Sequence, residues 1–189
     1  MTAPLRVGVL GCAEFARRRM LPAFDAAAEF ELSAVASRDP RRAADTAQPY
    51  GCRAVHGYRE LLTDPAIDAV YVPLPAALHD HWTEAALDAG KHVLAEKPLT
   101  TDPARTDRLF HLARSRALAL MENVLFVHHT QHQVVHALID AGGIGELRSL
   151  YAEFTIPRRG SDDIRHCPEL GGGALWDTAV SPVRAALHF

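Results

Sequence analysis

The sequence predicts an α/β fold, a doubly wound parallel sheet that is followed by an incomplete α+β region. Short apolar, β-branched runs alternate with longer segments whose apolar residues recur at helical spacing, as in successive βαβ units. The run AVYV at 69–72 has no polar alternation, which is typical of a strand that is buried on both faces. We therefore expect one complete domain over 1–122 and a partial second domain, for substrate binding or dimerisation, over 123–189.

The first elements follow from local signals. The apolar run LRVGVL predicts a strand at 5–10, and helical spacing of apolar residues predicts a helix at 15–28. A strand at 30–37 precedes a helix at 40–50, which has Pro40 in its first turn, where proline is tolerated. A weak strand at 53–56 and a short helix at 58–62 lead to the buried strand at 69–72, which Pro73 ends.

The remaining elements are read in the same way. A helix at 79–89 ends at Gly90, a strand follows at 92–96, and Thr101 or Asp102 caps a helix at 102–116. A sixth strand at 117–121 completes the first domain. The second half is expected to contain a helix at 131–141, a long strand at 146–157 and a helical segment after the glycines at 171–173.

Composition excludes several classes of function. The chain is 48% hydrophobic with a formal net charge of −3, so it has no basic excess for a phosphate backbone, and we expect no nucleic-acid partner. Its three cysteines are widely spaced, which argues against a disulfide framework. No apolar run approaches the roughly 18 residues of a membrane span. We expect a cytoplasmic protein without a membrane partner.

A glycine turn follows the first strand. Gly11, Ala13 and Ala16 align with the three glycines of the G-x-G-x-x-G motif, in which a tight turn and a helix N-terminus present N–H groups to a pyrophosphate. The motif alone is also compatible with a strand-to-helix turn in another doubly wound fold. Its position between the first strand and the first helix favours a dinucleotide site of the Rossmann type.

The end of the second strand bears on the choice of dinucleotide. Ser37, Arg38 and Asp39 stand where the residues that select the ribose are expected. Serine and arginine offer donors to a 2′-phosphate, whereas a carboxylate would accept from the 2′-hydroxyl of NAD. The sequence favours NADP(H), with the alternative that Arg38 is a solvated arginine and Asp39 is the selector.

Three further stretches carry a family resemblance. One reads DAVYVPLP from Asp68, a second reads AGKHVLAEKPL from Ala89, and MENVLFVHH follows from Met121. With its Glu-Lys-Pro motif at 96–98, the chain resembles the Gfo/Idh/MocA oxidoreductases, and within them the sugar 3-ketoreductases, which share the FTIP sequence at 154–157. This resemblance implies an NADP(H)-dependent enzyme that reduces the 3-keto group of a dTDP-linked keto-deoxysugar in deoxysugar and antibiotic biosynthesis.

Lys97 is the first candidate catalytic residue. A lysine at the carboxyl end of a parallel strand lies where such sheets bind ligands, and its ammonium can polarise a carbonyl and stabilise alkoxide charge. The alternative is a solvated loop lysine. With the resemblance, the expected cofactor-binding residues are Gly11, Cys12, Ala13, Phe15, Ala16, Ser37, Arg38, Leu74, His79, Glu96, Lys97 and Pro98.

A glycine-rich loop in the second half resembles the second motif of the family. It reads GGGALWDTAVSP from Gly171, and its spacing would put Asp177 and Ser181 on one face of a helix. Ser181 stands where the family has a His or Tyr proton donor, and a serine hydroxyl is a poorer acid. Asp177 and Ser181 join Lys97 as catalytic candidates. The expected substrate-binding residues are Asn123, Phe126, His128, Arg165 and Asp177.

Two alternatives remain open at this stage. Asp177 could simply bond nearby backbone, and the whole chain could be a non-catalytic NADP-binding homologue or a partner of a full-length enzyme. His128, His132 and His136 would share one face of a continuous helix, but no carboxylate or cysteine stands at ligand spacing, and we expect no metal. The exposed edge of the strand at 146–157 predicts a homo-oligomer.

Overall fold

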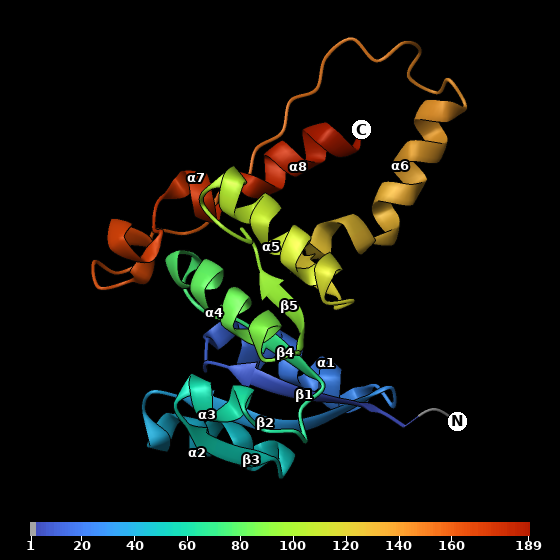
Figure 1. Ribbon diagram of the computed structural model, residues 1–189. Helices are drawn as coiled ribbons and strands as arrows, with labels where there is room; N and C mark the ends of the chain where they lie inside the picture. The colour runs from blue at the N-terminus through green and yellow to red at the C-terminus, as the bar shows by residue number, and fades with distance from the viewer. Residues whose placement is uncertain (1–2) are drawn as a thin grey trace. The chain divides into compact units, whose positions relative to one another are not determined.

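The computed structural model describes residues 3–189, which form two compact units (Figure 1). The first unit ends at Glu122 and the second spans Asn123–Phe189. Within residues 3–189, no helix combines the length and the apolar character that crossing a membrane requires.

The first unit contains a six-stranded sheet, which confirms the predicted α/β class. Its strands are β1 (Leu5–Leu10), β2 (Phe30–Ser37), β3 (Arg53–His56), β4 (Ala69–Val72), β5 (His92–Glu96) and β6 (Leu120–Asn123). Their order in the sheet is β3-β2-β1-β4-β5-β6, so the chain starts in the middle and winds outward in both directions (Figure 1). The strand pairs of β1 with β2 and β4, of β2 with β3, and of β4 with β5 are all parallel.

Helical segments connect these strands. They are η1 (Ala16–Met20), α1 (Leu21–Ala26), α2 (Pro40–Ala47), η2 (Gln48–Tyr50), α3 (Tyr58–Leu62), α4 (Ala76–Asp88) and α5 (Pro103–Ser115). Asp39 and Asp102 cap α2 and α5 by accepting hydrogen bonds from backbone N–H groups of the first turn. The sixth strand begins three residues later than predicted, because Ala117 takes a left-handed conformation (φ +54°) that ends α5.

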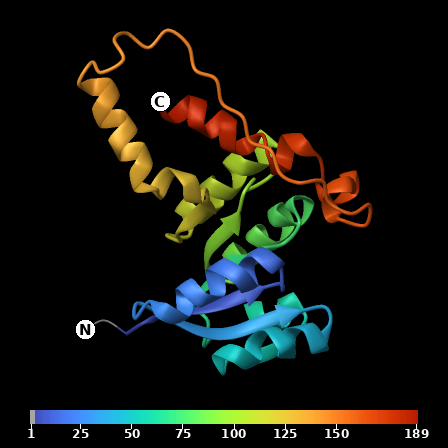
Figure 2. The ribbon, with the colours of Figure 1, turned by 180° about the vertical axis from the view of Figure 1, so that it is seen from behind.

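The core lies on both faces of the sheet. One cluster packs side chains of α3, α4 and α5, such as Leu61, Leu87 and Leu109, against the sheet. The other packs Leu21 and Phe24 of α1 against the opposite face of the sheet. Figure 2 shows this face, because it views the molecule from behind. Alternate residues of the buried strands supply both clusters, as expected of a parallel sheet that is covered on both sides.

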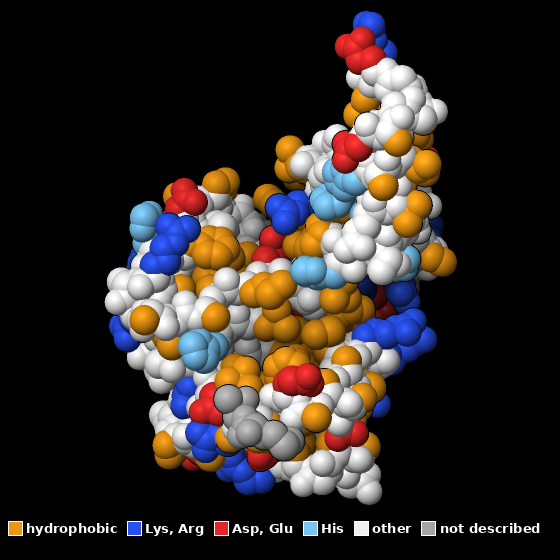
Figure 3. All heavy atoms as spheres, turned by 90° about the vertical axis from the view of Figure 1, so that its right-hand side faces the viewer, with side chains coloured by type: hydrophobic (Ala, Val, Ile, Leu, Met, Phe, Trp, Pro, Cys, Tyr) orange, Lys and Arg blue, Asp and Glu red, His pale blue; other side chains and the backbone are white. Residues whose placement is uncertain are grey.

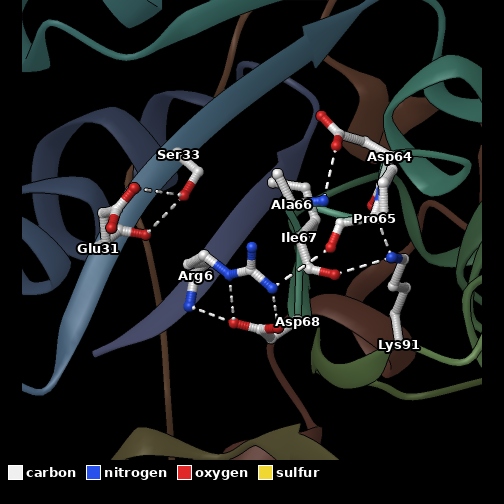
Figure 4. Close-up of polar contacts among 9 residues, drawn as sticks. All are labelled: Arg6, Glu31, Ser33, Asp64, Pro65, Ala66, Ile67, Asp68 and Lys91. Carbon is white, nitrogen blue, oxygen red and sulfur yellow. Dashed lines mark hydrogen bonds and ion pairs between the residues drawn. The ribbon is translucent and has the colours of Figure 1, made fainter. Parts of the chain in front are cut away.

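A polar cluster fixes the amino ends of the central strands (Figure 4). Arg6 at the start of β1 donates to both carboxylate oxygens of Asp68, with distances of 2.8 Å from Nε to Oδ2 and 2.6 Å from Nη2 to Oδ1. Lys91, just before β5, is buried, and its Nζ donates to the carbonyls of Asp64 and Ile67, each at 2.7 Å. These contacts link the amino ends of β1, β4 and β5. They thereby help to set where the carboxyl ends of the same strands lie.

The second unit consists of short helices and a long irregular segment. Its helices are η3 (Leu125–His128), α6 (Thr130–Asp140), η4 (Ile164–His166), η5 (Pro168–Leu170), α7 (Ala174–Asp177) and α8 (Val180–His188). The prediction of a strand at 146–157 is wrong. A strand requires a hydrogen-bonded neighbour, and no strand pairs with this segment within residues 3–189. The structure describes one chain and does not test the predicted homo-oligomer, which stays a prediction.

Hydrophobic side chains remain exposed in this unit. Val134 and Leu138 of α6 are 59% and 56% exposed, and Leu187 of α8 is 76% exposed. Figure 3 shows hydrophobic side chains that reach the molecular surface in several places. The unit thus buries far less of its apolar surface than the sheet domain does.

Candidate functional site

The carboxyl ends of the parallel strands meet at one edge of the sheet. Gly11 follows β1, Ser37 ends β2, Pro73 follows β4 and Lys97 follows β5. Open parallel sheets bind ligands at this edge, next to the point where the strand order reverses. In this sheet the reversal lies between β1 and β4. The topology therefore brings together the glycine turn, the end of β2 and Lys97.

The glycine turn is tight and closely packed. Gly11 has a φ of +120°, a conformation that side chains rarely adopt, and its N–H donates to the Ala36 carbonyl at 2.9 Å. A Cβ atom on Gly11 would lie 2.8 Å from Cδ2 of Leu74, so the turn and the residue after β4 approach each other closely. Ala16, at the third motif position, is fully buried, which explains why a small residue suffices there.

Two further residues of the turn face different surroundings. Cys12 is buried, and its thiol donates to the Arg42 carbonyl of α2 at 3.4 Å, so it packs toward the interior. Phe15 is 40% exposed at the start of the helical segment. The predicted helix at 15–28 contains a π-helical turn, η1, before α1 begins at Leu21.

The structure at the end of β2 distinguishes Arg38 from Asp39 as candidates for selecting the ribose. Oδ1 of Asp39 accepts from the N–H groups of Arg41 at 2.9 Å and Arg42 at 3.4 Å, so this carboxylate caps α2. Ser37 is buried, and its Oγ accepts from the Asp39 N–H at 3.1 Å. Arg38 is exposed, and its guanidinium lies near the Tyr58 hydroxyl, where it opposes the rise in pKa that burial causes in Tyr58.

The segment after β5 is held from several directions. Buried Tyr71 of β4 donates to Oε1 of Glu96 at 2.6 Å, and burial raises the pKa of this tyrosine. The peptide bond between Lys97 and Pro98 is cis. The Leu99 N–H donates to Oε1 of Glu122 at 2.9 Å. Lys97 itself is partly exposed, as a lysine that meets a ligand must be.

His79 is buried behind this edge. It is 1% exposed, its Nδ1 lies 2.7 Å from the Pro98 carbonyl, and its Nε2 lies 2.7 Å from the Leu74 carbonyl. Burial lowers the pKa of His79, and the two carbonyls act in the opposite direction. The sequence assigned His79 to the cofactor site, but a ring enclosed in this way contacts the protein backbone instead of an open surface.

Sequence reasoning missed two residues of this edge. Tyr71 and Glu122 hold the ends of the 96–99 segment, and neither was assigned to the site. A signal existed for Tyr71, because it is the one polar side chain in the buried run AVYV. Glu122 carried no comparable signal, since its partner lies 23 residues away in the sequence.

In the second unit, Asp177 is engaged by an arginine. Nε of Arg165 donates to Oδ2 of Asp177 at 2.6 Å, and its Nη1 donates to Oδ1 of Asp163 at 3.1 Å. The sequence assigned Arg165 and Asp177 to substrate binding, and the structure places them in direct contact. The guanidinium thus fixes the orientation of the Asp177 carboxylate.

The prediction that Asp177 and Ser181 lie on one continuous helix is wrong. Asp177 ends α7, whereas Ser181 lies in α8. The N–H groups of Thr178 and Ala179 both donate to the Ala174 carbonyl, at 3.0 and 2.9 Å, so the regular hydrogen-bond register is lost at this point. The relation between the two side chains is therefore not that of helix neighbours four residues apart.

The remaining candidates of this unit differ in their surroundings. Asn123 is buried, while His128 is exposed at the end of η3. Phe126 packs edge-on against His132, with ring centroids 4.8 Å apart. His128 precedes α6, so it does not share a helix with His132 and His136, in line with the helix predicted at 131–141. Within residues 3–189, no group of three His, Cys, Asp or Glu side chains is arranged to hold a metal ion.

Comparison with known proteins gives two family matches. Residues 5–124 match an oxidoreductase family with an NAD-binding Rossmann fold, named GFO_IDH_MocA. Residues 132–189 match the GFO/IDH/MocA C-terminal domain. The first match covers most of the first compact unit, and the second covers most of the second.

The most similar relatives include two curated enzymes and one solved structure. The chain is 58% identical over 96% of its length to dTDP-3,4-didehydro-2,6-dideoxy-alpha-D-glucose 3-reductase of Streptomyces violaceoruber and 57% identical over its full length to that of Saccharopolyspora spinosa. It spans only 53% and 57% of those two proteins. KijD10, a 3-ketoreductase from Actinomadura kijaniata solved with NADP and TDP-benzene, superimposes with a TM-score of 0.95 at 54% identity, covering 97% of this chain and 56% of KijD10.

Proposed function

The chain belongs to the Gfo/Idh/MocA oxidoreductase family, and on that premise we propose that it binds NADP(H) and serves the reduction of a dTDP-linked 3-keto-deoxysugar in deoxysugar biosynthesis. The observation that carries this proposal is the carboxyl edge of the sheet, which gathers the Gly11 turn, the end of β2 and Lys97. The names of the relatives support the substrate class, and TDP-benzene in KijD10 supports a thymidine diphosphate group.

The residues at the edge fit NADP(H) better than NAD(H). Asp39 uses its carboxylate to cap α2, which leaves the 2′ position of the ribose to Ser37 and the exposed guanidinium of Arg38. A guanidinium pairs well with a phosphate dianion, both by charge and by geometry. The positive φ of Gly11 allows the tight turn that would present backbone N–H groups to a pyrophosphate. When bound, NADPH would supply the hydride for the keto carbon.

Lys97 is the proposed electrophilic residue. Its ammonium would donate to the keto oxygen and stabilise the negative charge that develops there during reduction. Tyr71 and Glu122 hold the flanking residues Glu96 and Leu99, so the lysine starts from a fixed backbone. Asp177, oriented by Arg165, and Ser181 are proposed to act on the substrate side, where a proton must reach the new alkoxide.

The test is a fluorescence titration with NADPH and NADH, combined with a turnover assay on a dTDP-linked 3-keto-6-deoxy sugar. Arg38→Ala should weaken NADPH binding at least tenfold and leave NADH binding nearly unchanged, because a charge-assisted pair is lost only with the 2′-phosphate. Asp39→Asn is the matched control, since asparagine caps helices equally well. If Asp39→Asn instead weakens NADH binding and Arg38→Ala has no effect on NADPH, Asp39 is the selector and the preference for NADP(H) is wrong.

Catalysis itself is tested at Lys97. Lys97→Met keeps the length of the side chain and removes its charge, so turnover should fall by ~10² or more while NADPH affinity changes little. An unchanged rate would contradict the role of Lys97. A loss of NADPH binding of similar size would instead make it a cofactor-binding residue.

One observation favours a second candidate function, a non-catalytic NADP-binding homologue or partner of a full-length enzyme. Ser181 occupies the position at which the family resemblance calls for a Tyr or His proton donor, and it lies beyond a break in the helix. A positioned general acid typically contributes ~10² to 10⁴ in rate. NADPH binding without turnover would support this second function, and a gain in turnover for Ser181→Tyr would show that only the proton donor is missing.

A further inference from the structure

His79 is a deeply buried titratable side chain to which the proposed reaction assigns no step. It comes from the first half of α4, and its ring is 1% exposed. Both ring nitrogens lie 2.7 Å from a backbone carbonyl, that of Pro98 on one side and that of Leu74 on the other. A neutral imidazole donates to one of these carbonyls through its single N–H, and only a ring protonated on both nitrogens donates to both.

The two carbonyls belong to two different parts of the cofactor edge. Leu74 follows β4, and its Cδ2 would lie 2.8 Å from a Cβ on Gly11, so it packs directly against the glycine turn. Pro98 is the residue directly after Lys97. The imidazole therefore connects the residue that packs on the turn with the residue next to the candidate electrophile.

We propose that His79 is a positioning residue, which joins the Leu74 turn to the Lys97-Pro98 segment and so sets the place of the lysine relative to the nicotinamide cofactor. This inference rests on the proposed function, because it deepens the role of Lys97. A rigid link of this kind matters for rate, since a misplacement of about 1 Å at a reacting group can cost ~10²-fold. Direct contact between His79 and the cofactor is disfavoured by the burial of its ring.

Two variants and one control test the link. His79→Gln keeps one amide donor and one acceptor, whereas His79→Leu has similar bulk and no polar atom. His81→Gln is the matched control, because His81 lies two residues further along the same helix, is exposed, and packs edge-on against Trp82. Hydrogen–deuterium exchange, followed by mass spectrometry, compares the peptides that cover 73–78 and 96–100 with a peptide from β1.

We expect His79→Leu to accelerate exchange at least tenfold in 73–78 and 96–100 and to leave β1 unchanged. His79→Gln should show a smaller increase, and His81→Gln none. Exchange needs neither substrate nor cofactor, so this readout decides about the link even if the protein reduces no sugar. Equal exchange in wild type and in both His79 variants would overturn the proposal, as would an increase spread evenly over the sheet.

Turnover supplies the second readout. In both His79 variants kcat should fall by ~10-fold to 10²-fold, with KM for the keto sugar and Kd for NADPH changed less than about threefold. The glutamine variant should retain more activity than the leucine variant. If kcat is unchanged, or if NADPH affinity falls as far as kcat, His79 does not act by positioning Lys97. Failure of wild-type turnover would count against the proposed function and leave the exchange result to judge the link.

Discussion

The substitution Gly11→Ala tests the geometry of the glycine turn most directly. The backbone of Gly11 has a φ of +120°, which lies outside the regions that alanine adopts without strain. The added Cβ would also lie 2.8 Å from Cδ2 of Leu74. Both effects act on the same turn, where a pyrophosphate is proposed to approach the backbone.

The two effects differ in size. A strained conformation of this kind costs of order 1 to 3 kcal/mol. The overlap with Leu74 costs less, because its half-buried side chain can shift by a few tenths of an ångström. We therefore expect the free energy of unfolding to fall by about 2 to 3 kcal/mol. The shift of Leu74 and of the turn should weaken NADPH binding at least tenfold.

Urea denaturation measures the first quantity and fluorescence titration with NADPH the second. Gly51→Ala is the matched control, since Gly51 also has a positive φ, +61°, but a Cβ there meets no atom within 4 Å. That control should lose about 1 kcal/mol and keep its NADPH affinity. If Gly11→Ala is no less stable than Gly51→Ala and binds NADPH as the wild type does, the turn is not the close-approach site that we describe.

Three further predictions concern the stability of the sheet domain. Hydrogen bonding from Arg6 lowers the pKa of Asp68 to about 2, below its unfolded value, so this pair should contribute stability above about pH 4 that is lost as the pH falls through 2. After allowance for solvent screening, the pair should contribute about 1 kcal/mol to the free energy of unfolding. The urea midpoints of wild type and Asp68→Asn should therefore converge at low pH. Midpoints that stay equally far apart at every pH would contradict this assignment. Lys91→Met removes the donor to two backbone carbonyls and should cost about 1 to 3 kcal/mol in chemical denaturation; a neutral result would mean that water replaces the ammonium. Gly8→Ala would bring a Cβ within 2.6 Å of Cδ2 of the buried Leu61 and should lower the urea midpoint by an overpacking cost of about 1 to 3 kcal/mol.

Most of the sheet domain could be predicted from local sequence. The strands at 5–10, 69–72 and 92–96 and the short helix at 58–62 have the predicted bounds, because apolar runs and turn residues mark them locally. Asp39 and Asp102, each followed by proline, mark the starts of α2 and α5 in the same way. The strand at 146–157 failed because pairing depends on a distant partner, which alternation of apolar residues does not supply.

The candidate site was only partly predictable, since several of its contacts join residues far apart in sequence. The motif residues Gly11 and Lys97 could be found because each follows a recognisable strand. The link from Tyr71 to Glu96 spans 25 residues and that from His79 to Pro98 spans 19, and neither leaves a periodic trace. Asp39 shows the same limit at short range, because a carboxylate at a strand end can cap a helix or bind a ribose, and its place relative to α2 decides which.

The break between α7 and α8 changes what a substitution at Ser181 can show. In a continuous helix, a tyrosine at 181 would share a face with Asp177, and the missing proton donor would be restored by side-chain chemistry alone. Here the register slips at the Ala174 carbonyl, so the direction of residue 181 depends on the loop from Thr178 to Ala179. A gain of turnover in Ser181→Tyr therefore requires both a suitable acid and a suitable direction. If the gain appears only together with Arg165→Ala, the carboxylate that Arg165 holds was the constraint, and the orientation of Asp177 controls proton delivery.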